Sequence, residues 1–165
     1  TDQTGDRVDL DVVRGAFETN VLGAWQTTLA LLPLLRRSDS PRIVMVSSQG
    51  GSLASMGGGT PAYSVSKAAL NALTRVLAGD LRRDGILVNA VCPGYVDTPM
   101  TAQTVAMISA TTGRSEEQSR EVLARRQPIG RLVDPDEVAD AVLLCVASAA
   151  ITGQGINVDG GTVQS

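Results

Sequence analysis

Hydrophobic and polar residues follow two different periods along the chain, which predict alternating helices and strands. From about 10 to 37, apolar residues recur every three or four positions, which predicts a long amphipathic helix that Pro33 would bend or end. The run 42–48 is almost continuously apolar and ends in two serines, as expected of a strand buried on both faces. A second helix is predicted from Thr60-Pro61 to about Arg83, and a second buried strand over 86–92.

The C-terminal half continues this alternation. Residues 99–131 carry a less regular pattern, with one short polar helix expected to open at Ser115. Asp134-Pro135-Asp136-Glu137 is typical of a capping box that opens an apolar helix, here running through Ala147, and a last strand is predicted over 155–158. Helices that alternate with strands favour an α/β fold, in which a parallel sheet carries helices on its faces.

Composition limits the kinds of protein that this can be. The 165 residues are 43% hydrophobic and 19% charged, which suits a globular domain. A net charge of −3, with acids and bases interspersed, argues against a nucleic-acid partner. No apolar run reaches the roughly 18 residues of a membrane span and no signal peptide is visible, so we expect no membrane partner and a cytoplasmic location. Cys92 and Cys145 lie in apolar runs and are expected to be buried thiols.

The chain contains no histidine, and this restricts its chemistry. A Ser-His-Asp triad, a histidine-ligated zinc site and an imidazole base are all excluded. With two cysteines and no histidine, no metal site is expected. Proton transfer must then use tyrosine, lysine, cysteine or a carboxylate. Lys67 is the only lysine among the 14 basic residues, which either reflects a bias towards arginine or marks a position that needs an ammonium group.

Tyr63 and Lys67 form the strongest candidate pair for such chemistry. Residues four apart share a helical face, and a cation beside a phenol favours the phenolate, so the pair could act as a general acid/base. Ser48, at the end of the first strand, could donate a hydrogen bond to a substrate oxygen. From these residues alone, an exposed helical pair and a turn-forming serine remain open alternatives. A hydrolase that uses Ser48 is disfavoured, because the Gly-x-Ser-x-Gly elbow and any histidine are missing.

Taken together, six ordered blocks resemble the short-chain dehydrogenase/reductase family over nearly the whole chain. The blocks are Thr19-Asn20-Val21-Leu22-Gly23, Arg42-Ile43-Val44-Met45-Val46-Ser47-Ser48, Tyr63-Ser64-Val65-Ser66-Lys67-Ala68-Ala69-Leu70, Val88-Asn89-Ala90-Val91-Cys92-Pro93-Gly94-Tyr95-Val96-Asp97-Thr98, Gly130-Arg131-Leu132-Val133-Asp134-Pro135-Asp136-Glu137-Val138-Ala139 and Ile151-Thr152-Gly153-Gln154-Gly155-Ile156-Asn157-Val158-Asp159-Gly160-Gly161. The resemblance implies an NAD(P)-dependent oxidoreductase that moves a hydride between nicotinamide and a small-molecule carbonyl or secondary alcohol.

The resemblance also implies a role for individual residues. Tyr63 would exchange the proton with the substrate oxygen, and Lys67 would stabilise its phenolate and hold the nicotinamide ribose. Ser48, rather than Ser47, would orient and polarise the substrate oxygen. Asn20 would mark a helix irregularity whose main-chain carbonyl holds a water of the proton relay.

The cofactor-binding set implied by the resemblance extends beyond Tyr63 and Lys67. The strand end would line the nicotinamide side with Pro93, Gly94, Val96 and Thr98. Residues 99–131 would be the substrate lid. The cofactor would be NAD or NADP, with the residue that selects between them outside this sequence.

One departure from the family pattern is large. The family begins with a strand, a glycine-rich turn and a helix that hold the pyrophosphate and adenosine, and no such segment occurs here. We therefore expect residues 1–165 to form a single, N-terminally incomplete Rossmann-like domain, with about three strands that make up the second half of the sheet. The first of these strands would have a bare apolar edge. The hypothesis is a catalytic centre with an incomplete cofactor site.

The alternative hypothesis is a truncated, non-catalytic remnant that acts as an oligomerisation or interaction module. The helices predicted over 10–37 and 61–83 correspond to the surfaces through which family members form dimers and tetramers, so a homodimer or homotetramer is expected. Retention of Asn20, Ser48, Tyr63 and Lys67 together favours the enzyme.

Overall fold

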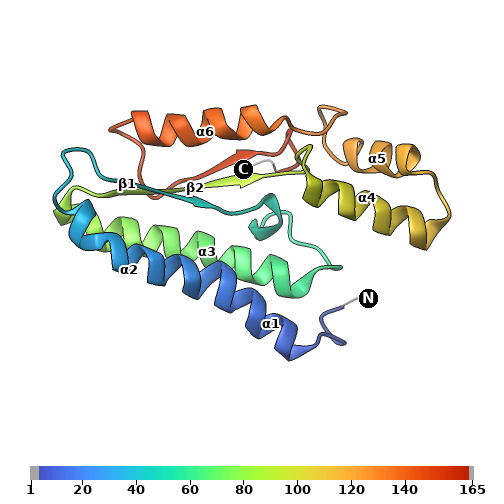
Figure 1. Cartoon of the computed structure of the whole chain (residues 1–165), viewed down its shortest axis with the longest axis horizontal. Helices are drawn as coiled ribbons and strands as arrows, with labels where there is room; N and C mark the ends of the chain where they lie inside the picture. Colours follow the sequence, from blue (N-terminus) through green and yellow to red (C-terminus); the bar gives the residue numbers. More distant parts are fainter. Residues whose placement is uncertain (1–3, 164–165) are drawn as a thin grey trace.

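The structure, a computed structural model, describes residues 4–163 and is built on a small parallel sheet. Its strands are β1 (Arg42–Val46), β2 (Leu87–Pro93) and β3 (Gly155–Val158), in the order β1-β2-β3. Val46 lies opposite Val91 in the first pairing, and Val91 lies opposite Ile156 in the second. Helices cover both faces of this sheet, so the predicted Rossmann-like α/β class with three parallel strands is confirmed (Figure 1).

The helices divide between the two faces as shown in Figure 1. One face carries α1 (Leu10–Phe17), the π-helical turn η1 (Glu18–Gly23), α2 (Ala24–Leu35) and α3 (Pro61–Asp80). The opposite face carries α6 (Pro135–Ala147), which opens with the predicted Asp134/Glu137 capping box. A short 3₁₀ turn, η2 (Gln49–Gly51), follows β1, and a second, η3 (Leu81–Asp84), ends α3.

The predicted long first helix is interrupted around Asn20, where the family resemblance implies an irregularity, and not at Pro33. Pro33 lies inside α2, which continues to Leu35, so the proline does not end the helix where it stands. Its missing N–H removes one hydrogen bond, the one to the Leu29 oxygen, while Arg36 N–H still donates to the Leu32 oxygen. The irregularity lies instead at η1, where the helix widens to a π turn around Asn20. Such turns are frequent at functional sites.

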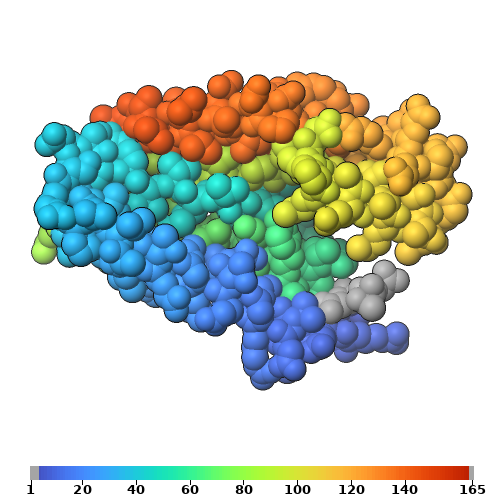
Figure 2. Space-filling model, viewed as in Figure 1, coloured from blue at the N-terminus to red at the C-terminus, as the bar shows by residue number. Residues whose placement is uncertain are grey.

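The segment 99–131 is more regular than its sequence pattern predicts. It contains α4 (Pro99–Thr112), capped by Thr98, and α5 (Glu116–Ala124), opened by the predicted Ser115/Gln118 capping box. The α4 helix escaped prediction because few of its residues are buried, so its apolar positions do not form a stripe. In Figure 2 the yellow and orange atoms of α4 and α5 stand together at one end of the molecule.

An aliphatic core joins the sheet to α3 and to the first helices. Its buried residues are Val21, Met45, Leu70, Leu73, Leu77, Ala78, Leu81, Ile86, Val88, Ala90 and Cys92. A smaller cluster of Val105, Leu123 and Leu132 holds α4 and α5 together. Both cysteines are buried free thiols, as predicted. The core thus fixes α3, the helix that carries Tyr63 and Lys67, directly against β1 and β2.

Candidate active site

Tyr63 and Lys67 lie on the first two turns of α3, which begins at Pro61. The Lys67 ammonium nitrogen lies 5.7 Å from the centroid of the Tyr63 ring. Tyr63 remains 40% exposed, whereas Lys67 is half-buried. The helix therefore presents both side chains on one face, at the end where the chain arrives from β1.

The Lys67 ammonium is anchored to the end of β1. Its Nζ donates a hydrogen bond to the main-chain oxygen of Val46 at 3.0 Å. In the same peptide unit, Ser47 N–H points the opposite way and donates to the Val91 oxygen of β2. The Val46 carbonyl oxygen therefore points away from β2, to the outer edge of β1. No strand pairs with that edge within residues 4–163. Burial lowers the pKa of the Lys67 ammonium, and the nearby Cys92 partly opposes this shift.

Ser48 lies where β1 passes into η2, close to the Tyr63 ring. Its Oγ accepts a hydrogen bond from Gly50 N–H at 3.1 Å. A Cβ placed on Gly50 would lie 3.5 Å from Ser48 Oγ and 3.9 Å from Tyr63 Cε1. The serine hydroxyl and the phenol ring therefore border the same small space. The structure brings Ser48, Tyr63 and Lys67 together.

Ser47 and Gly51 hold the turn of α3 that carries Lys67. Ser47 is buried, and its Oγ donates to the Lys67 main-chain oxygen at 3.3 Å. A Cβ on Gly51 would lie 2.7 Å from the Lys67 carbonyl carbon, so only glycine allows the loop to pack this closely on the helix. The sequence pattern did not single out Gly51, because a glycine after a strand also suits an ordinary turn.

Asn20 is connected to the same helix through one side chain. Its Nδ2 donates to Ser66 Oγ at 2.9 Å, and Ser66 Oγ donates to the main-chain oxygen of Tyr63 at 2.8 Å. Ser66 is fully buried between the two helices. The π turn of η1 is thus tied to the turn of α3 that bears Tyr63.

The segment 93–98 begins at the carboxyl end of β2, the strand next to β1. Gly94 N–H donates to the Val158 oxygen of β3 at 3.0 Å, and Val96 forms a parallel bridge with Val133. Thr98 caps α4 through its side chain. Ser48 and this segment therefore lie together at the carboxyl ends of β1 and β2, where open α/β sheets bind their ligands. The segment includes the predicted residues Pro93, Gly94, Val96 and Thr98.

The sequence pattern does not point to two polar groups that lie behind this segment, Gln127 and Arg131. Gln127 is fully buried and bonds to the main chain of Tyr95. Arg131 makes two hydrogen bonds to the Glu137 carboxylate, at 2.7 and 2.8 Å, and lowers its pKa to about 2. Glu137 could be found from the capping box at the start of α6. Gln127 could not, because it lies in an irregular stretch without hydrophobic periodicity.

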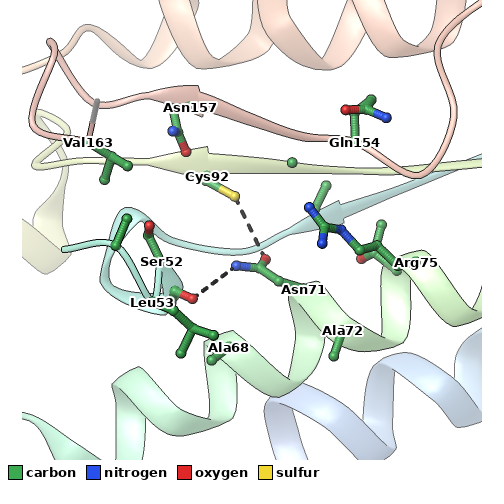
Figure 3. Close-up of a pocket in the computed structure, with 15 residues that line it drawn as sticks. Ser52, Leu53, Ala68, Asn71, Ala72, Arg75, Cys92, Gln154, Asn157 and Val163 are labelled. Atoms are coloured by element: carbon green, nitrogen blue, oxygen red, sulfur yellow. Dashed lines mark hydrogen bonds between the residues drawn. The ribbon is translucent and has the colours of Figure 1, made fainter. Parts of the chain in front are cut away.

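Two hollows flank α3. A groove of about 400 Å³ runs along the outer edge of β1 beside Asn20, Val44 and Lys67. A cavity of about 610 Å³ lies on the other side, between α3, β2 and β3 (Figure 3). In it, Asn71 donates to the Gly51 oxygen and accepts a weak hydrogen bond from the Cys92 thiol, whose pKa is raised by burial. Asn20 and Lys67 line the first hollow, whereas Ser48 and Tyr63 line neither of the two.

No cluster of three or more metal-ligating side chains occurs in residues 4–163. No helix in that range has both the length and the apolar character needed to cross a membrane.

Comparison with known proteins identifies the family. The family model described as enoyl-(acyl carrier protein) reductase matches residues 3–163. A putative ketoacyl reductase of Streptomyces coelicolor is 39% identical over 166 residues, which cover 98% of this chain and 61% of that protein. Oxidoreductase UcpA of Escherichia coli K12 is 40% identical over 148 residues, which cover 88% of this chain and 55% of UcpA. The chain thus spans a little over half of the length of these relatives.

Solved structures agree with the sequence comparison. An actinorhodin polyketide ketoreductase with NADPH is 35% identical and superposes with a TM-score of 0.84, over 95% of this chain and 61% of that one. A short chain dehydrogenase family protein from Francisella tularensis is 28% identical, with a TM-score of 0.86 over 94% of this chain and 63% of that one. The sheet, the site geometry and these matches lead to one conclusion: the chain belongs to the short-chain dehydrogenase/reductase family.

Proposed function

We propose that the chain is the catalytic part of an NAD(P)-dependent oxidoreductase that interconverts a small-molecule carbonyl and a secondary alcohol. The observation that carries the proposal is the meeting of Ser48, Tyr63 and Lys67 at the carboxyl end of β1. The relatives named ketoacyl reductase and oxidoreductase, and the ketoreductase structure with NADPH, support it.

Each side chain has a distinct part in the proposed reaction. Reduction adds a hydride to the carbonyl carbon and a proton to its oxygen. Ser48 Oγ donates a hydrogen bond that holds and polarises that oxygen, and the Tyr63 hydroxyl gives it the proton. Lys67 stabilises the phenolate that remains through its positive charge. In the reverse direction the phenolate accepts the proton of the alcohol. Asn20 supports this arrangement by fixing the Tyr63 turn through Ser66.

The donor set fits one end of a nicotinamide cofactor. Lys67 has three ammonium protons and uses one of them on Val46, which leaves donors for ribose hydroxyls. Pro93, Gly94, Val96 and Thr98 would form the wall beside the nicotinamide, which supplies the hydride when bound. The Gly-x-x-x-Gly-x-Gly spacing expected around the pyrophosphate does not occur in the sequence. The chain alone is therefore expected to hold the nicotinamide end and to lack a phosphate cradle.

The proposal extends to the surroundings of the site. We place α4 and α5, within residues 99–131, as the substrate lid, because they stand beyond the strand ends. We also propose that a second copy of the chain covers the first helices, because Leu22, Trp25 and Leu29 are large apolar residues left exposed there. Light scattering of the wild type and of Leu29→Glu tests this, with loss of the dimer or tetramer expected in the variant.

A cofactor titration tests the proposed function. Purified chain, and any longer protein that contains it, is mixed with NADH or NADPH and a panel of ketones, and nicotinamide fluorescence and oxidation are followed. Weak binding by the chain alone and turnover by a longer protein are expected. Tight, saturable binding by the 165-residue chain would contradict the incomplete cofactor site. No turnover in any form would contradict the oxidoreductase.

A further inference from the structure

Gln127 is among the largest fully buried side chains, although it carries a primary amide. It follows α5, where the chain returns from the excursion of α4 and α5 to the sheet, and is 1% exposed. A buried amide is costly unless its donors and acceptor are paired. Its partners therefore indicate what the side chain is for.

The Gln127 amide binds the main chain of Tyr95 as a neighbouring strand would. Its Oε1 accepts from Tyr95 N–H at 2.8 Å, and its Nε2 donates to the Tyr95 oxygen at 3.1 Å. The second Nε2 proton is directed to the Arg131 oxygen at 2.7 Å. The Tyr95 oxygen also accepts from Val133 N–H at 2.9 Å. The amide is thus the acceptor for Tyr95 N–H and a second donor to the Tyr95 oxygen, and it ties both groups to the turn that ends at Arg131.

Gly94 lies so close to the Gln127 amide that no side chain fits at position 94. A Cβ on Gly94 would lie 2.3 Å from Gln127 Oε1 and 2.8 Å from the Asp159 Cα. On its other side, Gly94 N–H donates to the Val158 oxygen of β3. The end of β2 is therefore gripped between β3 and the glutamine amide.

A side chain that merely fills space would not need this amide. Methionine has the same length and packs well in cores, yet it offers no donor and no comparable acceptor to Tyr95. The turn is also fixed at its own end: Gly130 N–H donates to the Gln127 oxygen, and the Arg131 side chain bonds to Glu137 at the start of α6. The amide consequently connects a rigid base to the strand end.

We propose that Gln127 is a positioning residue: by binding the Tyr95 main chain it holds the flanking residues Gly94 and Val96 in place as part of the wall of the nicotinamide site. This rests on the proposed function, which assigns Pro93, Gly94, Val96 and Thr98 to that wall. Gln127 acts through the main chain of Tyr95 and needs no contact with the cofactor itself.

Backbone hydrogen exchange directly tests the hydrogen bond between the Gln127 amide and Tyr95 N–H. In the wild type, the Tyr95 amide should exchange slowly although its acceptor is a side chain. Gln127→Met should speed its exchange about tenfold, as for loss of one buried hydrogen bond, and leave the amides of Val88 and Val91 unchanged. Gln103→Met, which alters an exposed glutamine of α4, is the control. Free exchange at Tyr95 in the wild type would overturn the proposal even if the variant does not fold, and so would unchanged exchange in a folded variant.

Steady-state kinetics tests the positioning role in whichever form of the protein turns over. Gln127→Met should raise the KM for the nicotinamide cofactor about tenfold and change kcat at saturating cofactor less than about twofold, because ground-state binding is what is lost. An unchanged cofactor KM would overturn the role. If the wild type shows no turnover, the proposed function fails and the cofactor role with it, while the exchange experiment still decides whether Gln127 holds Tyr95.

Discussion

The Lys67 ammonium and the Val46 carbonyl oxygen are joined by a hydrogen bond of 3.0 Å across 21 residues of chain. This bond places the positive charge at the end of β1 and, at the same time, 5.7 Å from the Tyr63 ring. The ammonium is partly desolvated there, and burial lowers its pKa. A small, triply donating cation suits this position, and a planar guanidinium does not.

Lys67→Arg should therefore abolish most of the activity despite keeping the charge. We expect reductase turnover to fall on the order of 100-fold or more, since an activated general acid typically contributes 10²–10⁴-fold. Thermal unfolding followed by circular dichroism should show a folded protein. Arg75→Lys, which changes an exposed cation on the same helix, should retain full activity. Activity of Lys67→Arg within a factor of two of wild type would contradict the assigned role.

Tyr63→Phe should remove turnover without weakening the fold. The substitution deletes one hydroxyl from a ring that is 40% exposed, so the thermal midpoint should stay close to that of the wild type. Cofactor oxidation should fall by about 10²–10⁴-fold. Tyr95→Phe is the matched control, because that hydroxyl accepts a bond from Arg126 and has no part in the proposed proton transfer. Equal losses in the two variants would count against Tyr63.

Gly94→Ala should destabilise the protein. Its new methyl group would lie 2.3 Å from Gln127 Oε1 and 2.8 Å from the Asp159 Cα, and main-chain atoms cannot move aside cheaply. We expect a loss of about 1–3 kcal/mol in the free energy of unfolding, as for other overpacked sites. Gly79→Ala in α3 meets no atom within 4 Å and should instead stabilise by about 0.5–1 kcal/mol. Urea unfolding of both variants measures the contrast.

Much of the fold could be predicted because burial leaves a clear mark on the sequence. The strand β2 is buried along most of its length and appears as a continuous apolar run, and the capping boxes at Ser115 and Asp134 mark two helix starts. The prediction that β1 is buried on both faces is wrong, because Met45 is its only buried residue and Val46 at its open edge is 58% exposed. The α4 helix could not be predicted in the same way, since only Thr101 and Val105 of its residues are buried. Its start depends on Thr98 and Pro99, whose residue types also suit a turn.

The site was predictable to the extent that its chemistry needs rare residue types. A single lysine four residues after a tyrosine pointed to α3, and the structure places Ser48 beside that pair. Residues that act through main-chain contacts left no such signal. Gln127 and Gly51 are ordinary residue types in loops, and only the fold shows what lies against them.

The Glu137 carboxylate should make stability fall in acid. Hydrogen bonds from Arg131, and from the main chain of Asp134, lower its pKa from 4.5 to about 2. Because the folded state holds the carboxylate ionised, its stabilising contribution is fully present above about pH 4.5 and is lost as the pH falls towards 2. Urea midpoints measured between pH 2 and 7 should therefore drop less steeply in Glu137→Gln than in the wild type. Glu117→Gln, on the exposed face of α5, should follow the wild-type profile. Parallel profiles for Glu137→Gln and the wild type would contradict this.

The segment from Gly51 to α3 packs against the helix at its first residue and makes few contacts beyond it. Gly51 is pressed against the Lys67 main chain, whereas Leu53 is 82% exposed and Gly57, Gly58 and Gly59 have no neighbour that a Cβ would meet within 4 Å. Exposed stretches of small residues are where proteases first cut a folded domain. A nick there would leave Ser48 on one fragment and Tyr63 on the other, with both still held by the core around β1 and β2. A cleaved sample could thus keep its helical spectrum and its size in solution while the proton donor and the oxygen-binding hydroxyl were no longer joined by peptide bonds.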